Sequence, residues 1–355
     1  MTVYDKNGQH FGTAFYNSRA RVPLRMVTHG KDTVDDAWFI RQLDRAVDLR
    51  LNWFGSNGET DAYRVIHSDG DGLSGLMVDR MGDVLSIEVY SLGVWQRLAP
   101  WIEHLHQRLG TKRSLVRVDP QVSRIEGIFP PKDDGSAALG NVRIKEHGLT
   151  YNVNFVDSHK SGFFCDQRDN RLLLSKLAEG PMLDLCCYTG GFSIAAAALG
   201  KARDITAIDL DETAIEQARK NAHLNRVQQH IRWVHTDAFD FVRQMLKNER
   251  RFRTVVVDPP KFVFSRDEEL DDGRRKYNDL NALALSLVEP GGLLLTCSCS
   301  GLLGEEEFTR IVIAAAHRHG RKLQFLNKTG AGIDHPVMSN CPESSYLKAL
   351  WARVW

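Results

Sequence analysis

Short apolar runs alternate with longer segments of helical period through the second half of the chain. We predict strands at residues 182–185, 205–208, 231–235, 254–257 and 293–297. Helices are expected between them, for instance over residues 212–224 and 278–287. Such alternation is typical of a mostly parallel sheet with helices on both faces. The last two apolar runs, at 323–327 and 346–355, would add a final pair of strands at the sheet edge.

The first 30 residues predict a small β unit. Residues 3–5 and 10–16 flank an Asn7-Gly8 turn, and Asn-Gly is a strong hairpin signal. Residues 21–27 would supply a third strand. Three short strands make only a thin core, so we expect residues 1–30 to be a remnant of a larger β domain or an appendage.

Residues 31–155 predict a separate α+β domain. Thr33 is expected to cap a helix, with Asp36 three positions on in a variant of the capping box. Apolar positions from Ala37 to Leu51 follow a period of 3.6 residues, which extends this helix to about Trp53. The other expected elements are a helix over 94–109 and strands near 63–66, 75–78, 84–89, 115–118 and 149–155. The change to strict alternation after them indicates a second domain.

Composition narrows the class of protein. A chain of 355 residues with 43% apolar content can bury the cores of two or three domains. Its net charge of +1 gives no global basic field, although a local basic surface is compatible with it. No apolar run reaches the roughly 18 residues of a membrane span. The six cysteines show neither C-x-x-C nor zinc-finger spacing, which predicts reduced thiols, a cytoplasmic location and no bound metal.

A glycine turn follows the first strand of the alternating region. The run from Asp184 through Tyr188, Thr189 and Gly190 leaves an apolar strand and enters a helix directly. Asp209 lies nineteen residues after Gly190, at the end of the next strand. A doubly wound sheet holds an adenosine and its ribose hydroxyls in this way. Because the turn lacks the G-x-G-x-x-G spacing that admits a pyrophosphate, S-adenosylmethionine is a better candidate than a dinucleotide.

Further carboxylates follow later strands. Asp258 begins the run Asp-Pro-Pro-Lys-Phe after the strand at 254–257, where the prolines fix the direction of its carboxylate. One interpretation is that this carboxylate accepts a hydrogen bond from an amino group or a protonated ring nitrogen of a base. The alternative is that the motif only ends the strand, since prolines are frequent in turns. Asp237 and Ala238 follow the strand at 231–235. They could contact an adenine amino group, or Asp237 could be a solvated surface residue.

Two cysteines mark the end of the strand at 293–297. A thiol at the mouth of the same cleft could act as a covalent nucleophile if a nearby positive charge or a helix end activates it. Both thiols could equally be small buried hydrophobes. Because side chains alternate with a period of two, Cys297 and Cys299 would lie on the same side of a continued strand, and the pattern does not choose between them.

A mixed aromatic and polar run precedes the first strand of the sheet. It reads S-G-F-F-C-D-Q-R from Ser161 to Arg168. Paired aromatic residues beside glycine could close over a cofactor or stack on a base. They could equally pack this linker onto the sheet.

These blocks, in this order, resemble one known family. The motifs are S-G-F-F-x-D-Q-R, D-L-C-x-Y-T-G-G-F, D-P-P-K-F, S-C-S-G and a D-H-P before Y-L-K. Together they are similar to the bacterial large-subunit (23S) ribosomal RNA cytosine-C5 methyltransferases, whose close relatives modify guanine. The resemblance implies a truncated PUA-like segment at 1–30, an RNA-binding central domain at 31–155 and a Rossmann-like class I methyltransferase domain at 156–355.

The resemblance also implies a set of functional residues. Contacts with S-adenosylmethionine are carried over to Phe163, Asp166, Gln167, Arg168, Asp184, Tyr188, Thr189, Gly190, Asp209, Asp237, Ala238 and Asp258. Cys299 is favoured as the nucleophile, with Asp258 and Lys261 in the catalytic set. The C-terminal pattern is matched, without an assigned role, by Asp334, His335, Pro336 and Lys348. The expected partner is ribosomal RNA, and a homodimer is left open.

The implied reaction begins with addition of the Cys299 thiolate to C6 of an unstacked cytosine, while Asp258 stabilises the protonated N3 and the amino edge. Many other RNA cytosine-C5 enzymes have a second cysteine where this chain has Pro260, so a water held by Asp258 is one candidate for the base that removes the C5 proton. Two alternatives stay open. One is direct methylation of a guanine nitrogen with a structural Cys299. The other is a non-catalytic module that binds RNA or the cofactor, against which Asp258, Lys261 and Cys299 argue together.

Overall fold

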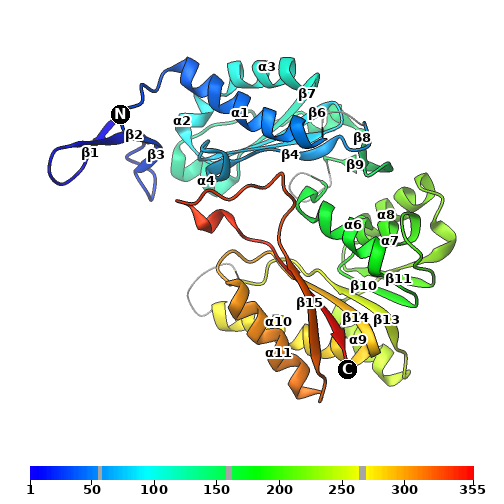
Figure 1. The fold of residues 1–355 in the computed structure, drawn as a ribbon. Helices are drawn as coiled ribbons and strands as arrows, with labels where there is room; N and C mark the ends of the chain where they lie inside the picture. Colours follow the sequence, from blue (N-terminus) through cyan, green and yellow to red (C-terminus); the bar gives the residue numbers. More distant parts are fainter. Residues whose placement is uncertain (55–57, 157–161, 264–268) are drawn as a thin grey trace. The chain divides into compact units, whose positions relative to one another are not determined.

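The computed structural model describes residues 1–54, 58–156, 162–263 and 269–355 (Figure 1). They form two compact units, each built from more than one stretch of the chain. The first unit comprises Met1–Gly148, Val153–Cys165 and Ile333–Ser344. The second comprises Leu149–Asn152, Asp166–Gly332 and Ser345–Trp355. Each unit contains its own hydrophobic core.

The second unit is built on one seven-stranded sheet. Its strands, in spatial order, are β12 (Ile231–His235), β11 (Ile205–Asp209), β10 (Met182–Leu185), β13 (Phe252–Val257), β14 (Val288–Ser298), β16 (Lys348–Val354) and β15 (Leu323–Thr329). The first five are parallel, and β16 is antiparallel to both β14 and β15. The prediction of a mostly parallel α/β sheet with an antiparallel edge is confirmed. The strand order reverses between β10 and β13, which is where a ligand crevice forms in such sheets.

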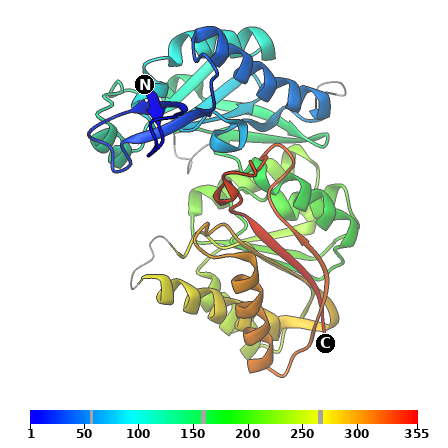
Figure 2. The same ribbon diagram turned by 60° about the vertical axis from the view of Figure 1, so that its left-hand side comes forward.

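Helices cover both faces of this sheet (Figures 1 and 2). One face carries α6 (Arg168–Leu177), α7 (Gly191–Ala198) and α8 (Glu212–Leu224), and the other carries α9 (Ala238–Lys247), α10 (Glu269–Leu287) and α11 (Glu305–Arg318). Leu183, Leu185, Val255 and Val257 are fully buried in the core. Strands that are apolar on both sides explain this burial. Helix α10 includes the helix predicted at 278–287, whereas α6 and α11 were not predicted.

The first unit contains a four-stranded sheet. Its strands follow the order β4 (Ala62–His67), β5 (Leu76–Met81), β6 (Val84–Val89) and β7 (Arg113–Arg117). Helices α1 (Asp36–Phe54) and α3 (Leu98–Leu109) pack against each other over it (Figure 1). The shorter elements are η1 (Ser68–Asp71), α2 (Leu92–Trp95), α4 (Pro120–Glu126), α5 (Ser136–Leu139) and the strand pair β8 (Asn141–Glu146) and β9 (Leu149–Asn154), which runs into the second unit.

Two helix predictions for this unit were wrong. Helix α1 begins at Asp36, and its cap is Asp35 instead of Thr33, because the Asp35 carboxylate accepts a 2.7 Å hydrogen bond from the amide of Trp38. The single helix predicted over 94–109 is two helices, α2 and α3. Pro100 explains the break, since proline is tolerated in the first turn of a helix but removes a hydrogen bond from its interior.

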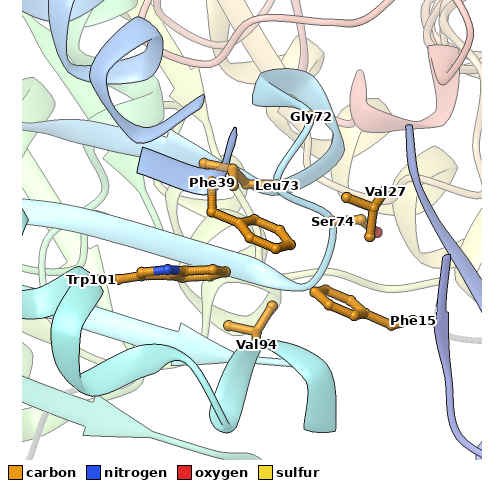
Figure 3. Close-up of a pocket in the computed structure, with 8 residues that line it drawn as sticks. All are labelled: Phe15, Val27, Phe39, Gly72, Leu73, Ser74, Val94 and Trp101. Atoms are coloured by element: carbon orange, nitrogen blue, oxygen red, sulfur yellow. The ribbon is translucent and has the colours of Figure 1, made fainter. Parts of the chain in front are cut away.

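A three-stranded antiparallel sheet precedes α1, as predicted. It consists of β1 (Thr2–Tyr4), β2 (His10–Tyr16) and β3 (Leu24–His29). Phe15 anchors it, because its ring stacks on Phe39 with centroids 5.8 Å apart and lies over Gly93, where a Cβ would come within 2.4 Å. Figure 3 shows Phe15 beside Val94 and across from Trp101, and these side chains line a void of about 10 Å³, the size of one water. The PUA-like assignment of residues 1–30 and the domain boundary at 155 stay predictions.

A buried polar cluster holds the segment Ile333–Ser344 within the first unit. Arg50 on α1 is fully buried and pairs with Asp71 at 2.8 Å. Its guanidinium also donates a 2.7 Å hydrogen bond to the carbonyl of Asp334. The Asp334 carboxylate accepts a 2.8 Å bond from the backbone amide of Arg64 on β4. The segment between β15 and β16 is therefore fixed to α1 and β4 by charged groups.

The D-H-P motif supplies the rest of this attachment. Nδ1 of His335 lies 3.0 Å from the Asp334 carboxylate, and the His335 ring meets the ring of His67 edge-on at 5.0 Å. Burial lowers the pKa of His67 to about 3, so this ring is neutral at physiological pH. Gly70 admits the segment, because a Cβ there would lie 2.1 Å from the carbonyl oxygen of Pro336. The motif that matched the family pattern without an assigned role thus has a structural one.

Replacing Arg50 by methionine is expected to lower the free energy of unfolding by about 3–5 kcal/mol, because Asp71 would stay buried without its partner. Urea denaturation measures the change. Arg41→Met, an exposed position on the same helix, is the matched control and should change stability by less than about 0.5 kcal/mol. Equal effects of the two substitutions would contradict the assigned role of Arg50.

All six cysteines are present as thiols. Within residues 1–54, 58–156, 162–263 and 269–355, no helix is long and apolar enough to cross a membrane. In the same residues, His, Cys, Asp and Glu side chains do not gather in a group that could hold a metal ion.

Candidate active site

The carboxyl ends of the parallel strands bring the predicted site residues of the second unit to one edge of the sheet. Asp184 lies in β10, Asp209 ends β11, Asp237 follows β12 and Asp258 follows β13. Cys299 follows β14. Because β10 pairs in parallel with β11 and β13, and β13 with β14, these ends share one edge. This is the edge where sheets of this class bind ligands.

The turn after β10 adopts an uncommon backbone. Cys186 has φ of 62°, Tyr188 48° and Gly190 87°, all in the left-handed region. The amide of Tyr188 donates a 2.8 Å hydrogen bond to the carboxylate of Asp209, which stabilises the turn against β11. Gly190 is required, because a Cβ there would lie 2.5 Å from the Trp233 ring. Thr189 is buried beside it.

Asp184 is a fully buried carboxyl group. Its Oδ2 accepts a 2.6 Å hydrogen bond from the hydroxyl of Ser193 in the first turn of α7. Its Oδ1 is buried and has no hydrogen-bond partner among the described residues. Burial, and to a lesser degree the charge of Asp209, raises the pKa of Asp184 to about 7. A buried acceptor without a partner is costly, so this oxygen is suited to a ligand that donates to it.

Asp184→Asn is expected to weaken cofactor binding and yet stabilise the empty protein. The pKa of Asp184 in the folded protein, about 7, lies above the ordinary aspartate value of 3.8, so the natural protein loses stability as the pH rises from about 4 through 7. Asparagine avoids that loss, and the variant should be the more stable by up to about 4 kcal/mol at pH 8 and by little at pH 4. Urea denaturation at both pH values measures this difference, and calorimetry should show S-adenosylmethionine binding weakened by about 10-fold or more.

The control for this prediction is Asp204→Asn, at an exposed position that precedes β11. It should leave both the pH dependence of stability and cofactor affinity unchanged. An Asp184→Asn variant that is destabilised equally at pH 4 and pH 8 would show that its charge carries no energetic cost in the fold.

Asp209 and Asp237 each accept hydrogen bonds from backbone amides, and both are partly exposed at the carboxyl edge of the sheet. Asp209 accepts hydrogen bonds from the amides of Tyr188 (2.8 Å) and Asp211 (2.9 Å), one on each oxygen. Burial raises its pKa. Each oxygen keeps a lone pair that a hydroxyl can use. Asp237 caps α9 through a 3.1 Å bond from the amide of Asp240, so part of its acceptor capacity is occupied, and Ala238 is the first residue of that helix.

Asp258 is held by a chain of hydrogen bonds. The side-chain amide of Gln167 donates to Asp258 (3.1 Å) and accepts from Asn170 (2.7 Å). The carbonyl oxygen of Asn170 accepts from the hydroxyl of Thr329 (2.6 Å), which accepts in turn from the indole of Trp351 (2.8 Å). Each donor and acceptor is fixed by the next, so the Gln167 amide presents its NH₂ group to Asp258. The chain of bonds orients the Asp258 carboxyl group.

Asp258 has more negative than positive groups around it. Burial raises its pKa to about 7, and the neighbouring carboxylates of Asp166 and Asp184 add to this effect. Arg171 and the Gln167 hydrogen bond oppose it. A half-buried carboxyl group with such a pKa exists in both protonation states near neutral pH, which suits it to accept and return a proton.

The predicted site residues just before α6 and at its start differ in their surroundings. Asp166 receives a 2.6 Å hydrogen bond from the hydroxyl of Tyr346 on one oxygen, and its other oxygen is buried without a partner among the described residues. Arg168 is fully buried and its guanidinium bonds to Asp169 at 3.0 Å. Phe163 is buried and belongs to the first unit. Ser161, at the start of this motif, lies outside the described residues.

The two cysteines at the end of β14 differ in exposure. Cys297 is completely buried within the strand, where burial and the charge of Asp258 raise the pKa of its thiol well above the ordinary range. Cys299 lies just beyond the last residue of the strand and is partly exposed. Lys261, after β13, is partly exposed as well. Of the two thiols, only Cys299 is accessible at the edge that carries the carboxylates.

The site fits a cationic adenosine cofactor. The acids Asp166, Asp184, Asp209 and Asp258 interact with one another closely enough to raise pKa values. Two of them carry buried oxygens that lack a partner among the described residues. A ligand with an ammonium group and a sulfonium centre would relieve both the like-charge repulsion and the unpaired acceptors. S-adenosylmethionine has these groups, and Asp209 lies where a doubly wound sheet binds ribose hydroxyls.

Comparison with known sequences supports the same conclusion. Residues 135–353 match the family described as S-adenosylmethionine-dependent methyltransferase. The protein named ribosomal RNA large subunit methyltransferase I of Shewanella frigidimarina (strain NCIMB 400) is 34% identical over 360 residues, which cover 100% of this chain and 90% of that protein. The protein of the same name from Citrobacter koseri is 32% identical over 359 residues, with coverage of 100% and 90%. This chain belongs to the family of S-adenosylmethionine-dependent methyltransferases.

Solved structures share the fold of this methyltransferase. A protein described as a SAM-dependent methyltransferase from Streptococcus mutans superposes with a TM-score of 0.82 at 22% identity, over 99% of this chain and 90% of that one. The tRNA m1G37 methyltransferase of M. jannaschii gives a TM-score of 0.53 at 19% identity, over 79% and 76%. At these identities the likeness concerns the fold alone. Because the second protein is named for a guanine, the fold leaves the target base of this methyltransferase open.

Sequence analysis did not identify the residues that support the site. They are Asn170, Arg171, Ser193, Trp233, Thr329, Tyr346 and Trp351. Only Ser193 gave a usable signal, since it lies in the helix turn that follows Gly190. The others come from elements far apart in the chain, and no spacing rule connects them.

Proposed function

We propose that this methyltransferase forms 5-methylcytosine in large-subunit ribosomal RNA through a covalent adduct with Cys299. The observation that carries the proposal is the arrangement of Asp258 and Cys299. They follow β13 and β14, which are adjacent and parallel, with Val257 opposite Thr296. A carboxyl group whose pKa is near 7 and a partly exposed thiol therefore leave the sheet at neighbouring points of one edge. Both groups are what cytosine C5 chemistry requires.

C5 of cytosine is too weak a nucleophile to take a methyl group unaided. In the proposed reaction the Cys299 thiolate forms an S–C6 bond, the ring gains electron density at C5, and Asp258 supports protonation at N3. S-adenosylmethionine supplies an electrophilic methyl group when it is bound. C5 would take up the methyl group, with S-adenosylhomocysteine as the leaving group, and lose its proton to a base, for which a water held by Asp258 is our candidate. The S–C6 bond then breaks and restores the thiolate, and N3 returns its proton to Asp258.

The difference between the two cysteines supports Cys299 as the nucleophile. A thiolate is the reactive form, and burial in apolar surroundings disfavours it. Cys297 is fully buried and its pKa is raised. Cys299 is exposed enough to meet a base that is turned out of its stack. Lys261, which follows the same strand as Asp258, is proposed as a cation near the reacting base.

Ribosomal RNA as the substrate is inferred from the names of the relatives. The first unit has a surface of basic and aromatic residues that is consistent with binding of ribosomal RNA. Residues 1–31 contain five Lys or Arg residues against one acidic residue, although the whole chain is nearly neutral. Their sheet exposes Tyr4 (63%), Phe11 (46%) and Tyr16 (57%). Basic and aromatic side chains together suit contacts to phosphates and unstacked bases, and action on ribosomal RNA would place the enzyme in the cytoplasm.

The proposal is tested by nucleoside mass spectrometry of unmodified 23S ribosomal RNA after incubation with the enzyme and isotope-labelled S-adenosylmethionine. We expect labelled 5-methylcytidine. Labelled methylguanosine would instead identify a direct-transfer enzyme in which Cys299 is structural. Cofactor binding without a labelled nucleoside in any ribosomal RNA would identify a binding module. Cys297→Ala serves as the matched control and should give the same product as the natural protein.

A further inference from the structure

Lys348 is an unusual buried cation close to Cys299. It is the first residue of β16 and lies opposite Ser298 of β14 in the antiparallel register. Its side chain is 6% exposed. Long ammonium side chains are seldom buried to this extent unless a partner balances the charge. The partner and the purpose of this ammonium group therefore need an explanation.

The ammonium group binds main-chain carbonyls instead of a carboxylate. Nζ donates to the carbonyl oxygen of Ser300 at 2.6 Å and to that of Tyr346 at 2.8 Å. The Ser300 carbonyl also accepts from the amide of Leu303 (3.0 Å). Ser300 is the residue directly after Cys299, so Lys348 fixes the turn that carries the thiol. None of the ion pairs formed by the described residues neutralises Lys348, which leaves its positive charge available to Cys299.

The charges of Lys348 and Cys299 also interact with each other. Burial lowers the pKa of Lys348 to about 8, and the charge of the Cys299 thiolate opposes that change while Lys261 adds to it. Interactions of this kind are reciprocal, so an ammonium group that the thiolate stabilises also stabilises the thiolate. The cation and the nucleophile are held on adjacent strands, β16 and β14.

Three other titratable groups of the described residues near the end of β14 are less suited to this part. The hydroxyl of Tyr277 on α10 lies 2.9 Å from the hydroxyl of Ser300. Burial, and to a lesser degree the charge of Cys299, raises the pKa of Tyr277. Burial also raises the pKa of the Cys297 thiol on β14, and the charge of Cys299 adds to that effect. Lys261 is a second cation, but it is partly exposed, where solvent screens its charge. Lys348 is the buried cation of the set.

We propose that Lys348 is the positioning residue of the nucleophile: it fixes the turn at Ser300 and supplies the buried positive charge that keeps Cys299 as a thiolate. The proposal rests on the proposed function only in calling Cys299 a nucleophile. The physical effect on the thiol exists whatever base the enzyme methylates.

The test is the pH dependence of Cys299 alkylation in the full-length protein. Iodoacetamide labelling would be followed by peptide mass spectrometry in a Cys297→Ala background, so that one thiol remains at the end of β14. Alkylation requires the thiolate. We expect Lys348→Met to move the midpoint of the pH profile upward by about one pH unit, which makes labelling at pH 7 about tenfold slower. Lys348→Arg, which keeps the charge, should recover most of the rate.

One control variant and two checks of folding make the outcome decisive. Lys328→Met, on the neighbouring strand β15 and exposed, should leave the profile unchanged. Circular dichroism and cofactor affinity report whether each variant is folded. A folded Lys348→Met variant with an unchanged alkylation profile, or an equal shift in Lys328→Met, would overturn the inference. A shifted profile together with full methylation by Cys299→Ala would leave the inference intact and refute the proposed function instead.

Discussion

Cys299→Ala is expected to reduce methylation of ribosomal RNA by at least about 10³-fold while leaving S-adenosylmethionine binding unchanged. The reason is that C5 of cytosine becomes nucleophilic only after a thiolate has added to C6. The neighbouring thiol cannot replace it, because Cys297 is completely buried with a raised pKa. Single-turnover rates with labelled cofactor measure the loss, and calorimetry measures cofactor binding.

Cys297→Ala is the matched comparison, since it removes the same atom two residues away. It should retain activity within a few-fold and lose some stability, because a buried side chain is truncated. If Cys297→Ala were inactive and Cys299→Ala active, the assignment of the nucleophile would be reversed. If both were active, the covalent scheme would fail and direct transfer to a guanine nitrogen would gain support.

Asp258→Asn is expected to lower kcat/KM by about 10²- to 10⁴-fold, the range typical of general acid–base residues. Asparagine keeps the shape and the hydrogen bond to Gln167 but cannot exchange a proton with N3 of the base. Burial raises the pKa of Asp258 to about 7, so the natural enzyme ionises this group only as the pH rises through 7. Because the protonated carboxyl group supplies the proton for N3, kcat/KM should fall as the pH rises through about 7 in the natural enzyme, and this step should be absent from Asp258→Asn.

Gln167→Leu provides a graded comparison for this prediction. The Gln167 amide lowers the pKa of Asp258, so its removal should move the step in kcat/KM to higher pH. A pH profile that keeps its step in Asp258→Asn would show that another group titrates there, and would remove Asp258 from the proton-transfer role.

The second unit was predictable because its pattern is simple. Strands buried on both faces, such as β10 and β13, are continuous apolar runs, and their carboxyl ends must meet at one edge. Together with the spacing from the glycine turn to Asp209, this rule located Asp209 and Asp258, and the family resemblance added Asp184. The position of β16 between β14 and β15 was not predictable in the same way, because strand order depends on long-range packing.

Other features depended on contacts between distant residues. Asp334 binds Arg50 across 284 positions of sequence, which places the segment between β15 and β16 in the first unit. Thr329 reaches Asn170 across 159 positions. Pro100 did carry a local signal, and the prediction that placed it in the interior of one helix was wrong for that reason, because it lies in the first turn of α3. The family resemblance named Lys348 without a role, and its burial beside Ser300 supplied one.

The most direct test of the account is to trap the covalent adduct. Large-subunit ribosomal RNA transcribed with 5-fluorocytidine should stall the reaction after methylation, because fluorine at C5 cannot leave as a proton. Incubation with the enzyme and S-adenosylmethionine should then give a protein–RNA complex that survives denaturing electrophoresis. We predict this complex for the natural enzyme and for Cys297→Ser, and its absence for Cys299→Ser. A complex that forms with Cys299→Ser, or no complex from an enzyme that methylates the unsubstituted RNA, would contradict the account.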